Sequence, residues 1–161
     1  MPPDLGRAQY RYIKYQYMRL TTHTDYGLRL LMLGAEMSPG AISISVVASQ
    51  LNVSRNHLMK VAQKLAKAGF MEPVRGRSGG FRLSKPPQEI RVGDAVRSLE
   101  FEMGLVECMR VQGSHCPLIP NCRLPHLFRE ATDAFFNILD SRTLDDLVSG
   151  NPQLIYLSEA R

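Results

Sequence analysis

The three cysteines of the chain all lie in one stretch, "ECMRVQGSHCPLIPNCRLPH", which spans residues 107–126. Their spacing is C-x7-C-x5-C, through Cys108, Cys116 and Cys122. This spacing differs from the paired C-x2-C of zinc ribbons, from the close repeats of bacterial ferredoxins and from a C-x-x-C redox motif. Because thiolates on one loop can converge on a soft metal, the stretch predicts an iron–sulfur cluster, with a zinc site or a thiol sensor as alternatives.

Three thiols leave the fourth ligand position of such a metal site without a cysteine. The candidates for this position are His115, His126 or a carboxylate from elsewhere, including the second subunit of a dimer. We recognise no nucleophile–base constellation in the remainder of the chain, so the sequence does not predict an enzyme.

Length and composition indicate one ordinary globular chain. It has 161 residues, of which 44% are hydrophobic and 22% are charged. The N-terminus does not have the pattern of a secretory signal, and the longest apolar stretch, "LRLLMLGA", is too short to cross a bilayer. We therefore expect a soluble, cytoplasmic protein without a membrane partner. In that reducing compartment, an odd number of clustered cysteines argues against a disulfide framework.

Charge is distributed unevenly along the chain. Residues 54–91 contain nine basic and two acidic residues, a net charge of +7, whereas residues 92–161 contain six basic and ten acidic residues, a net charge of −4. A basic segment of this kind suits a polyanion such as DNA, with a merely solvated surface as the alternative.

The cysteine stretch follows a series of predicted helices. In "THTDYGLRLLMLGAEM" the apolar positions recur every three or four residues, which predicts an amphipathic helix with Thr24 or Asp25 as its cap. The residues that form its apolar stripe are Leu28, Leu31, Met32 and Ala35. After the break at "SPGA", a short helix is expected with Val46, Val47 and Leu51 facing inward.

The next helix completes a helix-turn-helix. A tight turn is predicted at Asn52, Ser54 is placed to cap the second helix, and Gly69 is placed to end it. The predicted buried face of this helix consists of Leu58, Val61, Ala62 and Leu65. In such a motif the second helix presents its N-terminal side chains to the major groove of DNA.

A β-hairpin is predicted directly after the helix-turn-helix. Two extended runs, residues 71–75 and 81–83, flank the glycine-rich "GRSGG". In this position the hairpin is typical of the wing of a winged helix. The predicted fold class is therefore mainly α with a small β-hairpin wing, a winged helix-turn-helix followed by a long C-terminal helix.

The basic side chains of this region are the candidate DNA contacts. Arg55 can pair with guanine and Asn56 with adenine, while His57 is expected to contact phosphate or to have a structural role. Lysines along one flank of the helix suit phosphate contacts, and arginines at the wing suit a narrow minor groove. The predicted DNA-binding residues are Ser54, Arg55, Asn56, His57, Lys60, Arg75, Arg77 and Arg82, and Lys64 and Lys67 lie on the same flank as Lys60.

A long apolar stripe follows the cysteine stretch. In "LPHLFREATDAFFNILDSRTLDDLV" the apolar residues recur at helical spacing and include more aromatic side chains than a small winged domain needs internally. We expect a dimerisation helix, with an intramolecular core helix as the alternative. The predicted organisation is a flexible N-terminal extension (1–17), a winged helix-turn-helix domain (18–100), a cluster-binding loop (101–123), a dimerisation helix with a short following helix (124–150) and a C-terminal tail (151–161).

Taken in order, these motifs resemble the family of winged-helix iron–sulfur transcriptional regulators that includes IscR, RirA and NsrR. The resemblance covers residues 18 to about 148 and looks closest to the nitric-oxide-sensing repressors of that family. It depends on "MRLTTHTDYGLR", "VSRNHLMKVAQKLAKAGF", "VRGRSGGFRLSKP", "IRVGDAVRSLE" and the three cysteines followed by "DDLV".

The resemblance implies a homodimeric repressor that binds a double-stranded DNA operator and carries a 4Fe–4S cluster, or a 2Fe–2S form of it. Cys108, Cys116 and Cys122 would be ligands, and Asp25 of the second protomer would complete the site. In another branch a histidine three residues after the last cysteine is the ligand, but Pro125 stands there in this chain. Arg29 is placed to pair with Asp25 when no cluster is present.

Nitric oxide is the effector that the resemblance implies. An alternative within the same family is a regulator that responds to iron or cluster status. An alternative from another class is a zinc-stapled interaction module whose positive charge is incidental.

Overall fold

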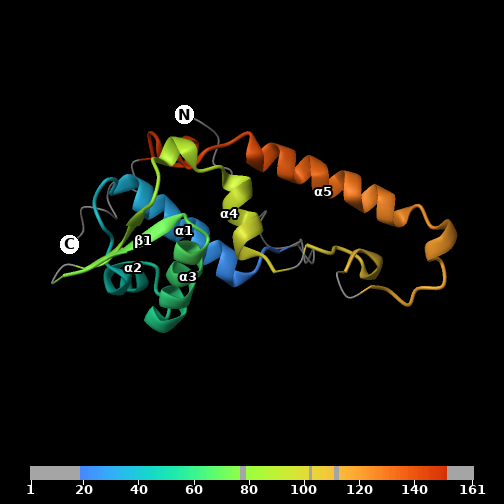
Figure 1. Cartoon of the computed structure of the whole chain (residues 1–161), viewed down its shortest axis with the longest axis horizontal. Coiled ribbons are helices and arrows are strands. Elements are labelled where there is room, and N and C mark those ends of the chain that lie inside the picture. Colours follow the sequence, from blue (N-terminus) through green and yellow to red (C-terminus); the bar gives the residue numbers. More distant parts are fainter. Residues whose placement is uncertain (1–18, 77–78, 102, 111–112, 152–161) are drawn as a thin grey trace, which may run out of the picture.

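The computed structural model describes residues 19–76, 79–101, 103–110 and 113–151. The predicted N-terminal extension, Arg77 and all but the first residue of the predicted C-terminal tail lie outside the described residues. The molecule consists of a winged head and one long helix that projects from it, with the segment between α4 and α5 running beside that helix (Figure 1). The elements are α1 (Thr22–Glu36), α2 (Ile44–Gln50), α3 (Arg55–Lys67), β1 (Met71–Val74), β2 (Gly80–Leu83), η1 (Pro87–Glu89), α4 (Val92–Leu99), η2 (Glu107–Met109), η3 (Ile119–Asn121), α5 (Leu124–Asp140) and α6 (Leu144–Val148).

Helix α1 begins earlier than its sequence suggests. The N-cap is Thr21, whose extended backbone lets its hydroxyl accept a hydrogen bond from the backbone N–H of Thr24 at 3.2 Å. The prediction that Thr24 or Asp25 caps this helix is therefore wrong, because both residues already lie within its first turn. Asp25 remains favourably placed there, since a negative charge near a helix N-terminus is stabilising.

The core of the head is built around α1 and α3. Leu30 and Leu31 of α1 are fully buried, as are all four residues of the predicted α3 face, which confirms that prediction. Helix α6 returns to this core after the long helix, because Leu144 and Val148 pack in the same apolar cluster as α1 and α3. The short C-terminal helix is thus part of the packing of the head.

Helices α2 and α3 form the predicted helix-turn-helix. Asn52 adopts a left-handed backbone with φ of 53°, which allows the tight turn, and the hydroxyl of Ser54 accepts a hydrogen bond from the backbone N–H of His57. The prediction that Val46 faces inward is wrong, since its side chain is 44% exposed. Because α2 starts at Ile44, its inward face consists of Ile44, Val47 and Ala48.

The wing is a two-stranded antiparallel hairpin, as predicted. Strands β1 and β2 pair in the register Met71↔Leu83 through Val74↔Gly80. Phe81 also pairs with Ile42, which connects the base of the wing to the segment before α2. A side chain at Gly80 would collide with the backbone carbonyl of Ile42, so this close approach requires glycine.

Helix α5 meets α4 of the head near its C-terminal end (Figure 1). There, the guanidinium of Arg97 on α4 pairs with both carboxylate oxygens of Asp140, at 2.7 and 2.6 Å, and lies 4.2 Å from the centre of the Phe136 ring. None of the 17 residues of α5 is buried, although the helix carries the predicted apolar stripe. No described helix is long and apolar enough to span a bilayer.

Candidate functional site

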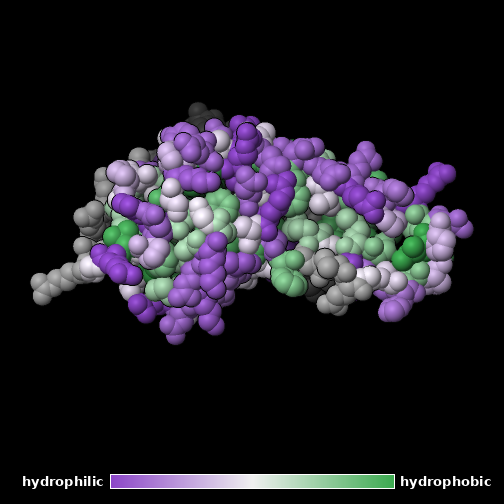
Figure 2. All heavy atoms as spheres, viewed as in Figure 1, coloured by the Kyte–Doolittle hydropathy of each residue, from purple (hydrophilic) through white to green (hydrophobic). Residues whose placement is uncertain are grey.

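The N-terminal end of α3 presents two of the predicted DNA contacts to solvent. Arg55 and Asn56 are both exposed, and the Nε of Arg55 donates a hydrogen bond to the hydroxyl of Ser45 on α2 at 2.8 Å. Hydrophilic residues gather on the surface of the head around α2 and α3 (Figure 2). The exposed guanidinium and amide at this end match the donors and acceptors that base edges display in the major groove.

His57 lies differently, with its ring turned toward α1. The ring meets that of Tyr26 edge-on at 5.3 Å between centroids, and it lies 6.1 Å from the ring of His23. Burial lowers the pKa of His23, and the nearby Lys64 acts in the same direction, which favours the neutral form of the His23 ring. This packing corresponds to the structural role that the sequence left open for His57. The sequence did not predict the contribution of His23 and Tyr26.

Two of the remaining basic residues of this region, Arg82 and Lys64, donate hydrogen bonds within the protein. Lys60, Lys67 and Arg75 are exposed. Arg82 pairs with Glu72 of the neighbouring strand at 2.6 Å. Lys64 is partly buried, and its ammonium donates to the backbone carbonyl of Leu99 at the end of α4 at 2.5 Å.

The three cysteines lie on the segment that connects α4 to α5, and all are free and partly exposed. Cys108 is in the single turn η2, and Cys122 directly follows the single turn η3. The backbone N–H of Cys116 donates to the hydroxyl of Ser114 at 3.1 Å. The cysteines thus lie on an irregular segment with two short turns within it.

The donor set of this loop fits a soft metal centre. Within residues 19–76, 79–101, 103–110 and 113–151, no three His, Cys, Asp or Glu side chains lie close enough to hold a metal ion. However, among the described residues 103–122 the backbone hydrogen bonds all connect residues three apart, so no long-range backbone bond fixes the loop to the head. Three free thiols on such a loop can close around iron, with one further ligand from outside it.

Asp25, the expected fourth ligand, lies on the surface of α1. Its carboxylate accepts from Arg29 one turn along the helix, at 2.8 Å from Nη2 and 3.2 Å from Nε, and the side chain is 47% exposed. The predicted Asp25–Arg29 pair is thus confirmed. An exposed ion pair of this kind contributes little to stability, so exchanging Arg29 for another partner costs little.

The end of α4 connects the cysteine loop to the start of α1 and to α3. The carboxylate of Glu100 accepts hydrogen bonds from the backbone N–H and the hydroxyl of Thr21, at 2.7 and 3.1 Å, and thereby holds the start of α1. The adjacent Leu99 carbonyl accepts from Lys64 of α3. The loop begins directly after Glu100. Sequence patterns did not identify this junction, because both contacts join residues far apart in the chain.

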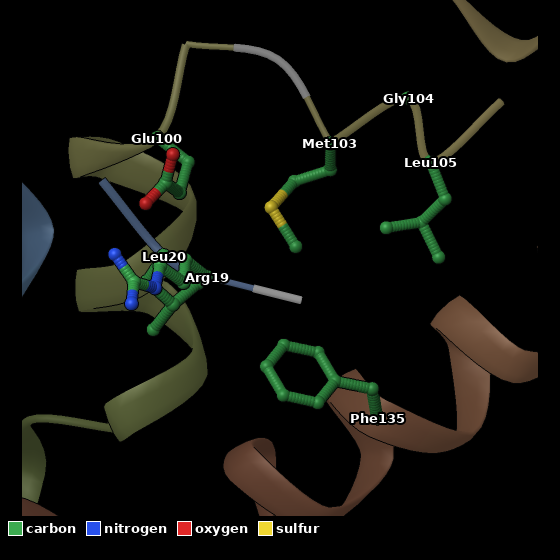
Figure 3. Close-up of a pocket in the computed structure, with 7 residues that line it drawn as sticks. All are labelled: Arg19, Leu20, Glu100, Met103, Gly104, Leu105 and Phe135. Atoms are coloured by element: carbon green, nitrogen blue, oxygen red, sulfur yellow. The ribbon is translucent and has the colours of Figure 1, made fainter. Parts of the chain in front are cut away.

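A cavity of about 500 Å³ opens beside this junction, between the start of α1, the loop and α5 (Figure 3). Met103 of the loop and Phe135 of α5 face each other across it, while Arg19 and Glu100 lie on another side. A side chain at Gly104 would crowd the backbone of Met109 and Arg110, so this wall packs directly against the turn that carries Cys108.

Comparison with known proteins agrees with this arrangement. The profile of the Rrf2 family, described as "Iron-dependent Transcriptional regulator", matches residues 20–150. The HTH-type transcriptional regulator NsrR of Bacillus licheniformis is 42% identical over 132 residues, which cover 81% of this chain and 92% of that protein. NsrR of Geobacillus kaustophilus is 42% identical over 145 residues, which cover 89% and 99%.

A solved structure, that of T. potens IscR, matches with a TM-score of 0.65 and 25% identity over 81% of this chain and 86% of that one. This match confirms the predicted fold class, a mainly helical winged helix-turn-helix with a two-stranded wing. The matched proteins are regulators of transcription rather than enzymes. The chain therefore belongs to the Rrf2 family of winged helix-turn-helix transcriptional regulators.

Proposed function

We propose that this Rrf2-family regulator is a cytoplasmic, homodimeric repressor whose operator binding is controlled by an iron–sulfur cluster that responds to nitric oxide. The observation that carries the proposal is the position of the cysteine loop. It starts directly after Leu99 and Glu100. These two residues are hydrogen-bonded to Lys64 of α3 and to Thr21, the N-cap of α1. A change in the conformation of the loop would therefore act close to α1 and α3, the two helices that position the DNA-binding side chains.

The ligands of the proposed 4Fe–4S cluster are Cys108, Cys116 and Cys122, with Asp25 of the second protomer as the fourth. When bound, such a cluster supplies iron that reacts with nitric oxide. The loop holds the cluster, Arg29 donates to the carboxylate of Asp25 when the cluster is absent, and Glu100 keeps the start of α1 in place. Two NsrR regulators are 42% identical to this chain, and its motifs resemble the nitric-oxide-sensing repressors of the family, which supports nitric oxide as the effector.

The proposed division of labour follows the elements. The head, residues 18–100, binds DNA through Ser54, Arg55, Asn56, Lys60, Arg75, Arg77 and Arg82, while His57 packs on Tyr26 of α1. The loop, residues 101–123, carries the cluster, and α5 forms the dimer. A two-fold dimer would present its two α3 helices to half-sites about one helical turn apart.

Anaerobic purification of the full chain tests the cofactor. We expect a brown protein with visible charge-transfer absorption and with iron and acid-labile sulfide in equal amounts. Cys116→Ala should lose both, and Asp25→Asn should give a cluster that decays faster on exposure to nitric oxide or air. Asp133→Asn, an exposed carboxylate on α5, is the matched control and should behave as the unchanged protein. A colourless protein with one zinc per chain would exclude the proposal.

Iron or cluster status is the second candidate signal, which the family description "Iron-dependent Transcriptional regulator" favours. Titrating nitric oxide and an iron chelator separately against operator binding distinguishes the two. If nitric oxide is the signal, operator binding should fall after only a few molecules of nitric oxide have been added per cluster. A chelator should then lower binding only as slowly as the cluster disassembles. Loss of binding with the chelator alone would favour the iron-status reading.

A further inference from the structure

The hydrogen bond between Arg55 and Ser45 connects the two helices of the helix-turn-helix at their DNA-facing end. Ser45 is the second residue of α2, and Arg55 is the first residue of α3. Both side chains are exposed, yet the Nε of Arg55 donates to the Ser45 hydroxyl at 2.8 Å. No packing forces this contact, so it fixes a side chain that would otherwise move freely.

The geometry of a guanidinium explains what this bond leaves available. Arginine has five N–H donors in a planar fork, and only the Nε–H is used by Ser45. The two terminal nitrogens remain free to donate side by side, which is the arrangement that pairs with O6 and N7 of guanine. Holding Nε also removes rotational freedom that a flexible arginine would otherwise lose on binding DNA.

The neighbouring side chains show that Arg55 is held in a different way from His57. The His57 ring packs on Tyr26 of α1 and is half-buried, so it is directed away from the exposed end of α3. Arg55 and Asn56 remain as the exposed pair at that end. Of these two, Arg55 has its direction set by a residue outside α3.

We propose that Ser45 is a positioning residue for base reading and that Arg55 reads guanine only as precisely as Ser45 orients it. The guanine-reading unit would then consist of one side chain from each helix of the motif. This inference rests on the proposed operator binding and adds a determinant of sequence preference to it. Ser45 need not touch a base.

Selection from a library of DNA duplexes with a random central region tests the inference, with the full-length, cluster-loaded protein prepared anaerobically. The proteins compared are the unchanged chain, Ser45→Ala, Ser45→Thr, Arg55→Lys and Ser49→Ala. Ser49 is a second exposed serine of α2, and it controls for the chemistry of the substitution. Alanine favours helix more than serine does, so neither alanine variant should weaken α2, and thermal unfolding should be unchanged in both.

We expect Ser45→Ala to reduce the preference for guanine by about 3- to 10-fold per half-site, at the same position that Arg55→Lys affects. Binding to unrelated DNA and its salt dependence should stay the same, since the charge is unchanged. Ser45→Thr keeps the hydroxyl and should retain the preference, as should Ser49→Ala.

A base preference in Ser45→Ala that equals that of the unchanged protein would overturn the inference and leave operator binding intact. So would an effect of Ser45→Ala at a position that Arg55→Lys does not alter. If the unchanged protein selects no sequence at all, the proposed function itself fails, and this inference with it.

Discussion

The exposed apolar stripe of α5 allows the proposed dimer to be tested with a single substitution, Leu127→Ala. Leu127 is 61% exposed in the single chain and lies in an apolar stripe that continues to Ile138, which is 66% exposed. Substitution by alanine removes Cγ and both Cδ atoms, worth roughly 2.4 kcal/mol if fully buried at about 0.8 kcal/mol per carbon.

Only the part of this energy that the second subunit supplies affects association. With 61% of the side chain exposed, about 1.5 kcal/mol is available, and a two-fold interface counts it twice. The expected loss is therefore roughly 3 kcal/mol, which corresponds to about a 100-fold weaker dimer at 1.4 kcal/mol per tenfold. Because alanine is also a good helix former, α5 itself should remain helical.

Sedimentation velocity over a range of protein concentrations measures this change. Two controls separate it from misfolding. Asp133→Ala replaces an exposed residue on the opposite side of α5 and should leave the dimer unchanged. Leu144→Ala removes the same atoms from a residue only 1% exposed in the head core, and it should lower the free energy of unfolding by about 2–5 kcal/mol.

A Leu127→Ala protein that dimerises as tightly as the unchanged chain would refute the assignment of this stripe to the interface. A monomeric unchanged chain would refute the dimer as a whole. In either case, the exposed stripe of α5 would require another explanation.

Three further predictions concern the head and its junctions. Glu100→Ala removes the carboxylate oxygen that accepts both hydrogen bonds from Thr21, so the amides of the first turn of α1 should exchange with solvent faster by hydrogen-exchange mass spectrometry. Unchanged exchange would argue against this role. Ser54→Ala removes the cap of α3 and should lower the free energy of unfolding by about 0.5–1 kcal/mol, a fall in Tm of roughly 1–4 °C. This cost lies at the low end for a helix cap because the cap hydrogen bond is long, 3.5 Å. The affinity for DNA should fall as well. The hydrogen bond from Arg97 lowers the pKa of Asp140 below its ordinary value near 3.8. The contribution of this pair to the free energy of unfolding is therefore complete above about pH 4, and it is lost as the pH falls through the lowered pKa. In acid unfolding followed by circular dichroism, Asp140→Asn should therefore lose less stability below about pH 4 than the unchanged protein, and a parallel loss in both would contradict the assignment.

The local sequence determined most of the elements of the fold. Helical spacing of apolar residues predicted the buried face of α3 completely, since one regular period decides which side chains share a face. Asn52 and Ser54 marked the turn and the cap for local reasons, a left-handed backbone and a hydroxyl acceptor. The chemistry of three free thiols on one loop was also visible in the sequence.

Errors arose where a boundary had to be chosen. Thr21, Thr24 and Asp25 can each cap a helix, and the sequence pattern predicts Thr24 or Asp25, whereas Thr21 is the N-cap in the structure. The pattern likewise predicts that Val46 faces inward, but it is exposed, and Ile44, Val47 and Ala48 are the buried residues of α2. Both segments are helices, as predicted. A displacement of one or a few residues along a helix nevertheless changes which residue caps it and which side chain faces the core.

Only the tertiary structure decided which polar groups meet. The contacts of Ser45 with Arg55, of Lys64 with Leu99 and of Glu100 with Thr21 join residues separated by 10, 35 and 79 positions. A periodic pattern states which face of a helix is apolar, but it does not specify the partner of a polar side chain. That partner is fixed by how the helices cross, and the crossing depends on packing of the whole core. The sequence by itself thus determined the reading head and the thiol loop, and the tertiary structure determined how the two are connected.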